Sequence, residues 1–454
     1  MKMLEKMFRL NENHTTVRTE VIAGITTFMT MAYILAVNPN MLAAAGMDAT
    51  AVLIATCLAS FVGTICMALL ANYPFALAPG MGLNAYFAYT VCGNMGYDWR
   101  VALAAVAVEG VIFIILSLTN VREAIFNAIP GTLKKGVSAG IGLFIAFIGL
   151  QNGHIVVNND STLLSYVDFA GNFHTEGICA ILALIGLFLI VILYFKGVKG
   201  AILIGIIATW ILGMLAQACG LYVIDAENGF YSLYPSFQLT DFTKIGETFG
   251  QVFRADFSNV SITNFIVVLF AFLFVDMFDT IGTLVGVATK ANMLDKNEKL
   301  PRIKQALLAD AIATTAGAVF GTSTTTTFVE SSAGVGAGAR TGLASIVTGF
   351  LFLVAIFFAP VFTAIPGFAT APALIFVGFL MVGAIVQINF NDLTEAVPAY
   401  LCFLAMPLMY SISEGIAMGV ISYVIINLCC GKAKKITPLM YVLAILFICK
   451  YIFL

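Results

Sequence analysis

Charged residues are scarce in this chain of 454 residues. Only 10% of the residues are Asp, Glu, Lys or Arg, whereas 61% are hydrophobic. About 25% of the residues in a typical soluble domain are charged, so this composition excludes a water-soluble globular protein. The three histidines fall at or outside the ends of apolar runs, and the nine cysteines show no metal-ligand spacing. The low content of charged residues indicates a membrane protein, and the positions of the histidines and cysteines argue against a metal site. The sequence has no basic patch that would indicate a nucleic-acid partner.

Apolar runs occur from one end of the chain to the other. Each is long enough to cross a hydrocarbon core of about 30 Å as a helix. The runs are continuous in Leu, Ile, Ala, Phe and Val rather than alternating, which favours helices over a β-barrel. We therefore predict fourteen membrane-spanning segments and an apolar tail at 437–454. The segments lie near 17–41, 51–71, 75–92, 100–120, 132–151, 176–195, 200–219, 262–289, 305–320, 323–341, 343–363, 370–388, 395–412 and 414–430.

The distribution of lysine and arginine predicts the orientation of these segments. If the N-terminus lies inside, the inner segments hold most of the basic residues, and the outer segments hold only Arg100, Lys244 and Arg254. Cytoplasmic loops carry an excess of Lys and Arg, so we expect a cytoplasmic N-terminus.

Two similar stretches suggest an internal repeat. Residues 129–151 and 365–387 both begin with Ile-Pro-Gly and end with Gln at the same spacing. They are the fifth and twelfth predicted segments, so they cross the membrane in opposite directions. The sequence thus predicts two halves of inverted topology.

Two segments contain too many helix breakers to be regular helices. They are 72–91, "NYPFALAPGMGLNAYFAYTV", and 324–342, "TTTTFVESSAGVGAGARTG". Irregular backbone at membrane depth is tolerated only where protein or a water-filled cavity satisfies its polar groups. Broken segments in two inverted halves indicate a central binding site. The alternative is that the glycines only allow close helix packing.

Several polar side chains lie inside the apolar segments, where a charge costs at least a few kcal/mol and usually serves a function. They are Asn84, Glu109, Asp276, Asp279, Asp310 and Glu330. Asp279 and Glu330 are flanked by small residues that leave room for a ligand. We interpret Glu109, which has no obvious partner, and Asp310 as structural groups, and Asp276 as a residue that orients its helix.

The chemistry of these groups limits the ligand. Carboxyl and amide groups complement a planar heterocycle that carries ring N–H and carbonyl groups. Without a Lys or Arg at this depth, an anionic substrate would find only helix N-termini. Tyr86, Phe87, Phe278 and Phe328 are near in sequence and could enclose a ring. Burial favours the protonated carboxyl group, which suggests proton coupling, although Asp, Thr and carbonyl oxygens could also bind Na⁺.

Four motifs together resemble the nucleobase:cation symporter-2 family, specifically its AzgA-like purine permease branch. They are "TTVRTEVIAGITTFMTMAYILAVNP" (15–39), "PFALAPGMGLNAYFA" (74–88), "FVDMFDTIGTLVGVA" (274–288) and "TTTTFVESSAGVGAGARTG" (324–342). The similarity covers about residues 10 to 430. It implies an all-α polytopic, uracil-permease-like fold of two inverted repeats with seven segments each, and short strands in segments 3 and 10. It also implies a core domain (1–120 and 261–363), a gate domain (121–260 and 364–430) and a separate apolar C-terminal tail (431–454).

The same resemblance implies roles for individual residues. Asp279, Glu330 and Asn84 match the substrate-binding positions of the family, and we add Phe278, Phe328 and Ser331 as neighbours that contact the substrate. We expect support for the site from Asp310, Asp276 and Thr283. The uracil branch carries a histidine where this chain has Thr283, so the proton carrier is either Asp279 or Glu330.

The resemblance implies a secondary transporter rather than an enzyme. We expect a multi-pass protein of the inner membrane that imports purine bases by proton symport and alternating access. Hypoxanthine and guanine are the first expectation. An adenine permease, a Na⁺-coupled symporter and, more distantly, an ion channel are the alternatives. The expected partners are the bilayer and a small purine base, no cofactor is expected, and a homodimer through the gate domain is left open.

Overall fold

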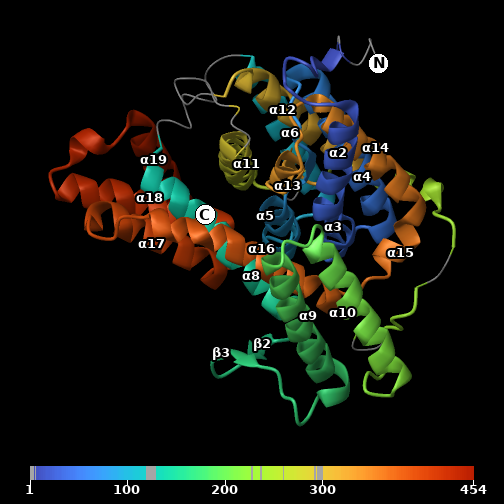
Figure 1. Ribbon diagram of the computed structural model, residues 1–454. Helices are drawn as coiled ribbons and strands as arrows, with labels where there is room; N and C mark the ends of the chain where they lie inside the picture. The colour runs from blue at the N-terminus through green and yellow to red at the C-terminus, as the bar shows by residue number, and fades with distance from the viewer. Residues whose placement is uncertain are drawn as a thin grey trace.

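The computed structural model describes residues 5, 7–118, 129–225, 229–235, 238–258, 260–290, 293 and 300–453 (Figure 1). The first elements are α2 (Val17–Met31), α3 (Ile34–Ala43), α4 (Ala49–Cys66), η1 (Met67–Ala71), β1 (Leu77–Pro79), α5 (Met81–Ala85), η2 (Tyr86–Asn94), α6 (Trp99–Ser117), α8 (Gly131–Asn152), β2 (Val156–Asn159), β3 (Leu163–Tyr166), η3 (Phe173–Gly177), α9 (Ile178–Phe195) and α10 (Ala201–Ala218). They are followed by η5 (Phe242–Glu247), η6 (Gln251–Arg254), α11 (Ile262–Lys290), α12 (Ile303–Phe320), β4 (Thr325–Thr327), α13 (Ser331–Gly336), α14 (Gly342–Ala355), η7 (Ile356–Phe358), α15 (Ala359–Thr363), α16 (Gly367–Val382), η8 (Gly383–Gln387), α17 (Leu393–Leu408), α18 (Ile412–Cys429), η9 (Ala433–Lys435) and α19 (Pro438–Phe453).

Long apolar helices dominate the structure. Within the described residues, 11 helical stretches have the length and composition needed to cross a membrane, and Leu393–Leu408 and Pro438–Cys449 are shorter apolar helices. Helix α9 exposes Ile185, Phe188 and Ile192 along one face. Such an apolar surface is stable against lipid rather than water. The prediction of a helical polytopic membrane protein is therefore confirmed, while the count of fourteen spans stays a prediction.

The two segments 72–91 and 324–342 are not continuous helices. The first forms strand β1, helix α5 and the π-helical stretch η2, and the second forms strand β4 and helix α13. Strands β1 and β4 pair antiparallel, with Leu77 opposite Thr327 and Pro79 opposite Thr325. The short strands expected in these segments are thus present.

The first predicted segment is also interrupted. Helix α2 ends at Met31 and α3 begins at Ile34, so Ala32 and Tyr33 lie at a break. The Thr30 hydroxyl donates to the carbonyl oxygens of Thr26 and Thr27, one turn earlier. Such bonds compete with the backbone ladder and bend helices.

The helices pack in two sets. In one set α8 packs against α16, α17 and α18, and α9 and α10 pack against α16; in the other, α4 and α6 pack against α12, and α14 packs against α2 and α4. Figure 1 shows α17, α18 and α19 on one side of the molecule and α2, α4 and α14 on the other. A Cβ atom on Gly378 would lie 2.4 Å from the carbonyl oxygen of Gly142, so α8 and α16 approach more closely than a larger residue allows.

Candidate binding site

The site is built around the crossing of the β1 and β4 segments. Two backbone hydrogen bonds extend the strand pair, from the Gly80 amide to the Thr324 carbonyl (3.0 Å) and from the Phe328 amide to the Ala76 carbonyl (2.9 Å). The protein therefore satisfies these polar groups itself, as a membrane interior requires. Helix α5 begins two residues after β1 ends, and α13 begins four residues after β4 ends.

Asp279 reaches the crossing from α11. Its Oδ2 accepts a hydrogen bond from the Thr326 hydroxyl at 3.3 Å. A Cβ atom on Gly80 would lie 3.4 Å from Oδ2, so glycine at this position keeps space beside the carboxyl group. Asp279 is partly accessible, whereas its neighbours Asp276 and Thr280 are fully buried.

Glu330 lies between β4 and α13 and is likewise partly accessible. The Tyr33 hydroxyl donates to Glu330 Oε1 at 2.6 Å, and the Thr30 hydroxyl lies 3.4 Å from the Glu330 carbonyl oxygen. Tyr33 is fully buried. The break between α2 and α3 thus contacts the β4 segment directly.

The structure brings Asp279 and Glu330 together. Asp279 accepts a hydrogen bond from Thr326 within β4, and Glu330 follows three residues after the end of β4. They come from α11 and from the segment after β4, which are separate parts of the chain. The arrangement offers two partly accessible carboxyl groups and a phenol, which are suitable partners for N–H and carbonyl groups of a small ligand.

Thr280 joins the supporting acids. Its hydroxyl lies 2.9 Å from Asp276 Oδ1 and 2.9 Å from Asp310 Oδ1. Asp276, Thr280 and Asp310 are fully buried, and Thr283 is buried one turn further along α11. The contact links α11 to α12 behind Asp279.

Asn84 and Ser331 form hydrogen bonds that stabilise the crossing of the β1 and β4 segments. Ser323 donates to Asn84 Oδ1, and the Asn84 amide lies 3.4 Å from the Pro79 carbonyl. The Ala76 amide donates to Ser331 Oγ at 3.0 Å. Asn84 and Ser331 are fully buried and Phe328 is nearly so. The side chain of Phe278 lies outside the described residues.

Glu109 has a partner that sequence analysis did not find. The Thr324 hydroxyl, next to β4, donates to Glu109 Oε2 at 2.8 Å, and Glu109 is fully buried on α6. Tyr33 was also missed. A single aromatic residue in an apolar run is normally part of the core, and only the neighbouring threonines hinted at the break.

Known proteins resemble this chain over nearly its full length. A family model described as Permease family matches residues 18–418. The guanine/hypoxanthine permease PbuO of Bacillus subtilis is 47% identical over 97% of this chain and 98% of its own length. The adenine permease AdeP of Escherichia coli is 42% identical over 100% of this chain and 96% of its own length. The transmembrane domain of the cyanobacterial bicarbonate transporter BicA superposes with a TM-score of 0.64 at 15% identity, covering 89% of this chain and 97% of that domain, which shows a shared fold.

Proposed function

Because this chain belongs to the Permease family, in its nucleobase:cation symporter-2 group, we propose that it imports purine bases across the cytoplasmic membrane by proton symport. Hypoxanthine and guanine are the proposed substrates, with adenine as the alternative, since relatives named for both kinds of base match the whole chain. The observation that carries the proposal is the pair of partly accessible carboxyl groups, Asp279 and Glu330, beside the strand crossing.

Asp279 and Glu330 are proposed to accept hydrogen bonds from ring N–H groups of the base. Asn84 is proposed to complete the site. Its side-chain amide is held by Ser323 and Pro79, which occupy one lone pair and one N–H group. The second N–H group and the second lone pair of the amide are proposed to serve the base. Phe328 and Phe278 are proposed to lie against the faces of the ring.

Either carboxyl group can carry the coupled proton. Removal from water favours the neutral form of a carboxyl group, and a bound base changes the hydrogen-bonding partners of that group. Proton binding and substrate binding then influence each other, which is the requirement for symport. Na⁺ coupling is the alternative, because carboxyl and hydroxyl oxygens also suit that cation.

The proposed mechanism is alternating access by a core domain that moves against a gate domain. The two packing sets support this division: α2, α4, α6, α12 and α14 form one, and α8–α10 with α16–α18 form the other. Fourteen segments in two inverted repeats, a cytoplasmic N-terminus and a homodimer through the gate domain remain part of the same proposal.

Uptake of radiolabelled hypoxanthine in cells that lack their own purine transporters tests the function. We expect saturable uptake that collapses with a protonophore and persists when Na⁺ is replaced by choline. Unlabelled guanine should compete strongly and uracil weakly. If adenine competes better than guanine, the adenine alternative replaces the first proposal, and uptake that requires Na⁺ contradicts proton symport.

A further inference from the structure

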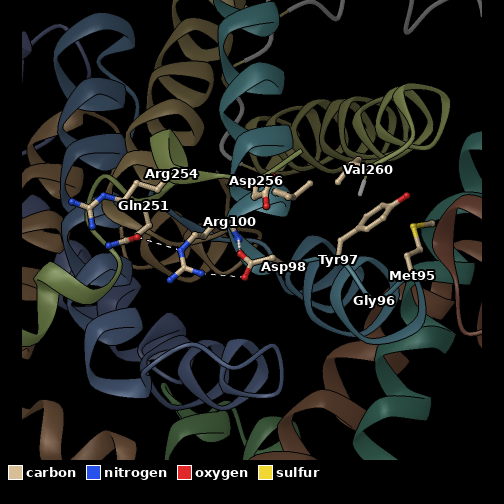
Figure 2. A pocket seen from close by; sticks show the side chains of 10 residues that line it. Met95, Gly96, Tyr97, Asp98, Arg100, Gln251, Arg254, Asp256 and Val260 are labelled. Carbon is tan, nitrogen blue, oxygen red and sulfur yellow. Dashed lines mark hydrogen bonds and ion pairs between the residues drawn. The ribbon is translucent and has the colours of Figure 1, made fainter. Parts of the chain in front are cut away.

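A cavity lies away from the two carboxyl groups. It has a volume of about 650 Å³ and is bordered by the end of η2, the start of α6, η6 and the residues before α11. Figure 2 shows Arg254, Gln251, Arg100 and Asp98 in one row, with Tyr97 and Met95 at the other end of the cavity. The volume lies within the range of about 300–1,000 Å³ that is usual for small-molecule sites.

Two elements connect this cavity to the candidate binding site. Helix α5 and η2 run from Gly80, beside the Asp279 carboxyl group, to the cavity wall at Met95. Helix α11 begins two residues after Val260, which lines the cavity, and carries Asp279 further along. At 1.5 Å per residue, Asp279 lies about 25 Å along α11 from its first turn. The cavity is therefore separated from Asp279 by the length of α5 and η2 and by about 25 Å of α11.

The charges in the cavity are balanced. Arg100 and Arg254 are offset by Asp98 and Asp256, so an anionic ligand gains no net attraction. Hydrogen bonds from Ser258 to the Asp256 carboxyl group hold its pKa below the ordinary value, and Asp256 is thus an acceptor at neutral pH. The lining offers both strong donors and strong acceptors, which suits a neutral polar ligand.

The guanidinium groups of Arg100 and Arg254 differ in their hydrogen bonds and ion pairs. Arg100 Nη1 lies 3.1 Å from Asp98 Oδ2, and Arg100 Nε donates to Gln251 Oε1 at 3.2 Å. In the part of the chain that the structure describes, no hydrogen bond or ion pair engages the Arg254 guanidinium. The N–H donors of Arg254 can therefore bind a ligand, while Arg100 is held in place by Asp98 and Gln251.

From this geometry we propose that the cavity is a peripheral binding site for 6-oxopurine bases, which rests on the proposed transport of purines. A guanidinium donates two parallel hydrogen bonds to the O6 and N7 atoms of such a base. Adenine places an amino donor where O6 would be, so it pairs poorly with the two parallel N–H groups of the guanidinium. Figure 2 places Asp256 and Tyr97 away from the Arg254 guanidinium, beyond Gln251 and Arg100, so Arg254 alone recognises the O6 and N7 edge of the base. The site captures oxopurines before they reach Asp279 and Glu330.

Uptake kinetics test the role of Arg254. Arg254→Ala is expected to raise KM for hypoxanthine about three- to tenfold with an unchanged maximal rate, and Arg254→Lys, which lacks the fork, should behave similarly. Inhibition of hypoxanthine uptake by adenine should change less than inhibition by guanine. Lys244→Ala is the matched control, because Lys244 lies in the same connecting region but outside this cavity. An unchanged KM in Arg254→Ala, or an equal rise in Lys244→Ala, would overturn the proposal.

Direct binding separates this site from the central one. Purified Glu330→Gln protein should retain weak binding of radiolabelled hypoxanthine, and Glu330→Gln combined with Arg254→Ala should lose it. Loss of all binding in Glu330→Gln alone contradicts a peripheral site even when the wild-type protein transports. If the wild-type protein neither binds nor transports hypoxanthine, the proposed function fails first. Thermal unfolding of each variant shows that the fold is retained.

Discussion

The hydroxyl of Tyr33 provides a sharp test of the candidate site. Tyr33→Phe removes one oxygen atom from a fully buried side chain and leaves the ring that fills the break between α2 and α3. The lost contact is the 2.6 Å hydrogen bond to Glu330 Oε1. A hydrogen bond to a charged group contributes about 1.5–3 kcal/mol. If Tyr33 positions Glu330 for the substrate, this energy corresponds to a loss of about tenfold to hundredfold in uptake efficiency.

The assay is the initial rate of radiolabelled hypoxanthine uptake over a range of concentrations, normalised to the amount of protein in the membrane. Tyr222→Phe is the matched control, since the Tyr222 hydroxyl also donates a partly buried hydrogen bond, to the Tyr231 carbonyl at 2.8 Å, but outside the site. It should affect protein abundance more than KM. Tyr33→Phe uptake efficiency within about twofold of the wild type would refute the argument that Tyr33 positions Glu330.

Four further changes have defined outcomes. Glu330→Gln should abolish uptake at normal abundance, and near-normal transport would remove Glu330 from the site. Asp279→Asn should weaken transport or make it independent of pH; unchanged pH dependence would assign the proton to Glu330. Glu109→Gln should lower the melting temperature with little change in KM, so a change of affinity at full stability would contradict a structural role. Gly334→Ala should destabilise the protein by about 1–3 kcal/mol in unfolding measurements, because the new Cβ would lie 2.0 Å from the Thr27 hydroxyl; an unchanged melting temperature would show that the helices can separate.

Sequence patterns predicted the breaks in the fold because proline and glycine act locally. Pro79 and Gly80 prevent a regular helix wherever they occur, so the irregular segment at 72–91 follows from its own residues. The short strands in these two segments were expected only through the family resemblance, and the structure adds the pairing of β1 with β4. Nothing in "TTTTF" specifies the register, because four equal side chains fit a one-residue shift equally well.

Sequence patterns did not predict the contacts between distant segments. Tyr33 looks like any core aromatic residue, and its contact with Glu330 depends on how α2 meets the β4 segment. The residues within one helical turn of Glu109 in the sequence are apolar or glycine and do not mark its role, whereas the structure shows a hydrogen bond from Thr324 in the other half of the chain. The sequence identifies residues that are costly to bury, while tertiary packing decides which of them share one hydrogen bond.

The strand pair also constrains how the protein is made. Ala76 and Phe328 are about 250 residues apart, yet the Ala76 carbonyl accepts a hydrogen bond from the Phe328 amide, and the Gly80 amide donates to the Thr324 carbonyl. When the ribosome has completed only the first half of the chain, the Ala76 carbonyl and the Gly80 amide lack these partners, and lipid offers no substitute. This part of the molecule therefore matures late, after β4 has been synthesised, and the translocon or bound water must shelter it until then. A polypeptide that stops after α10 would lack β4 and would leave the Gly80 amide and the Ala76 carbonyl without these partners.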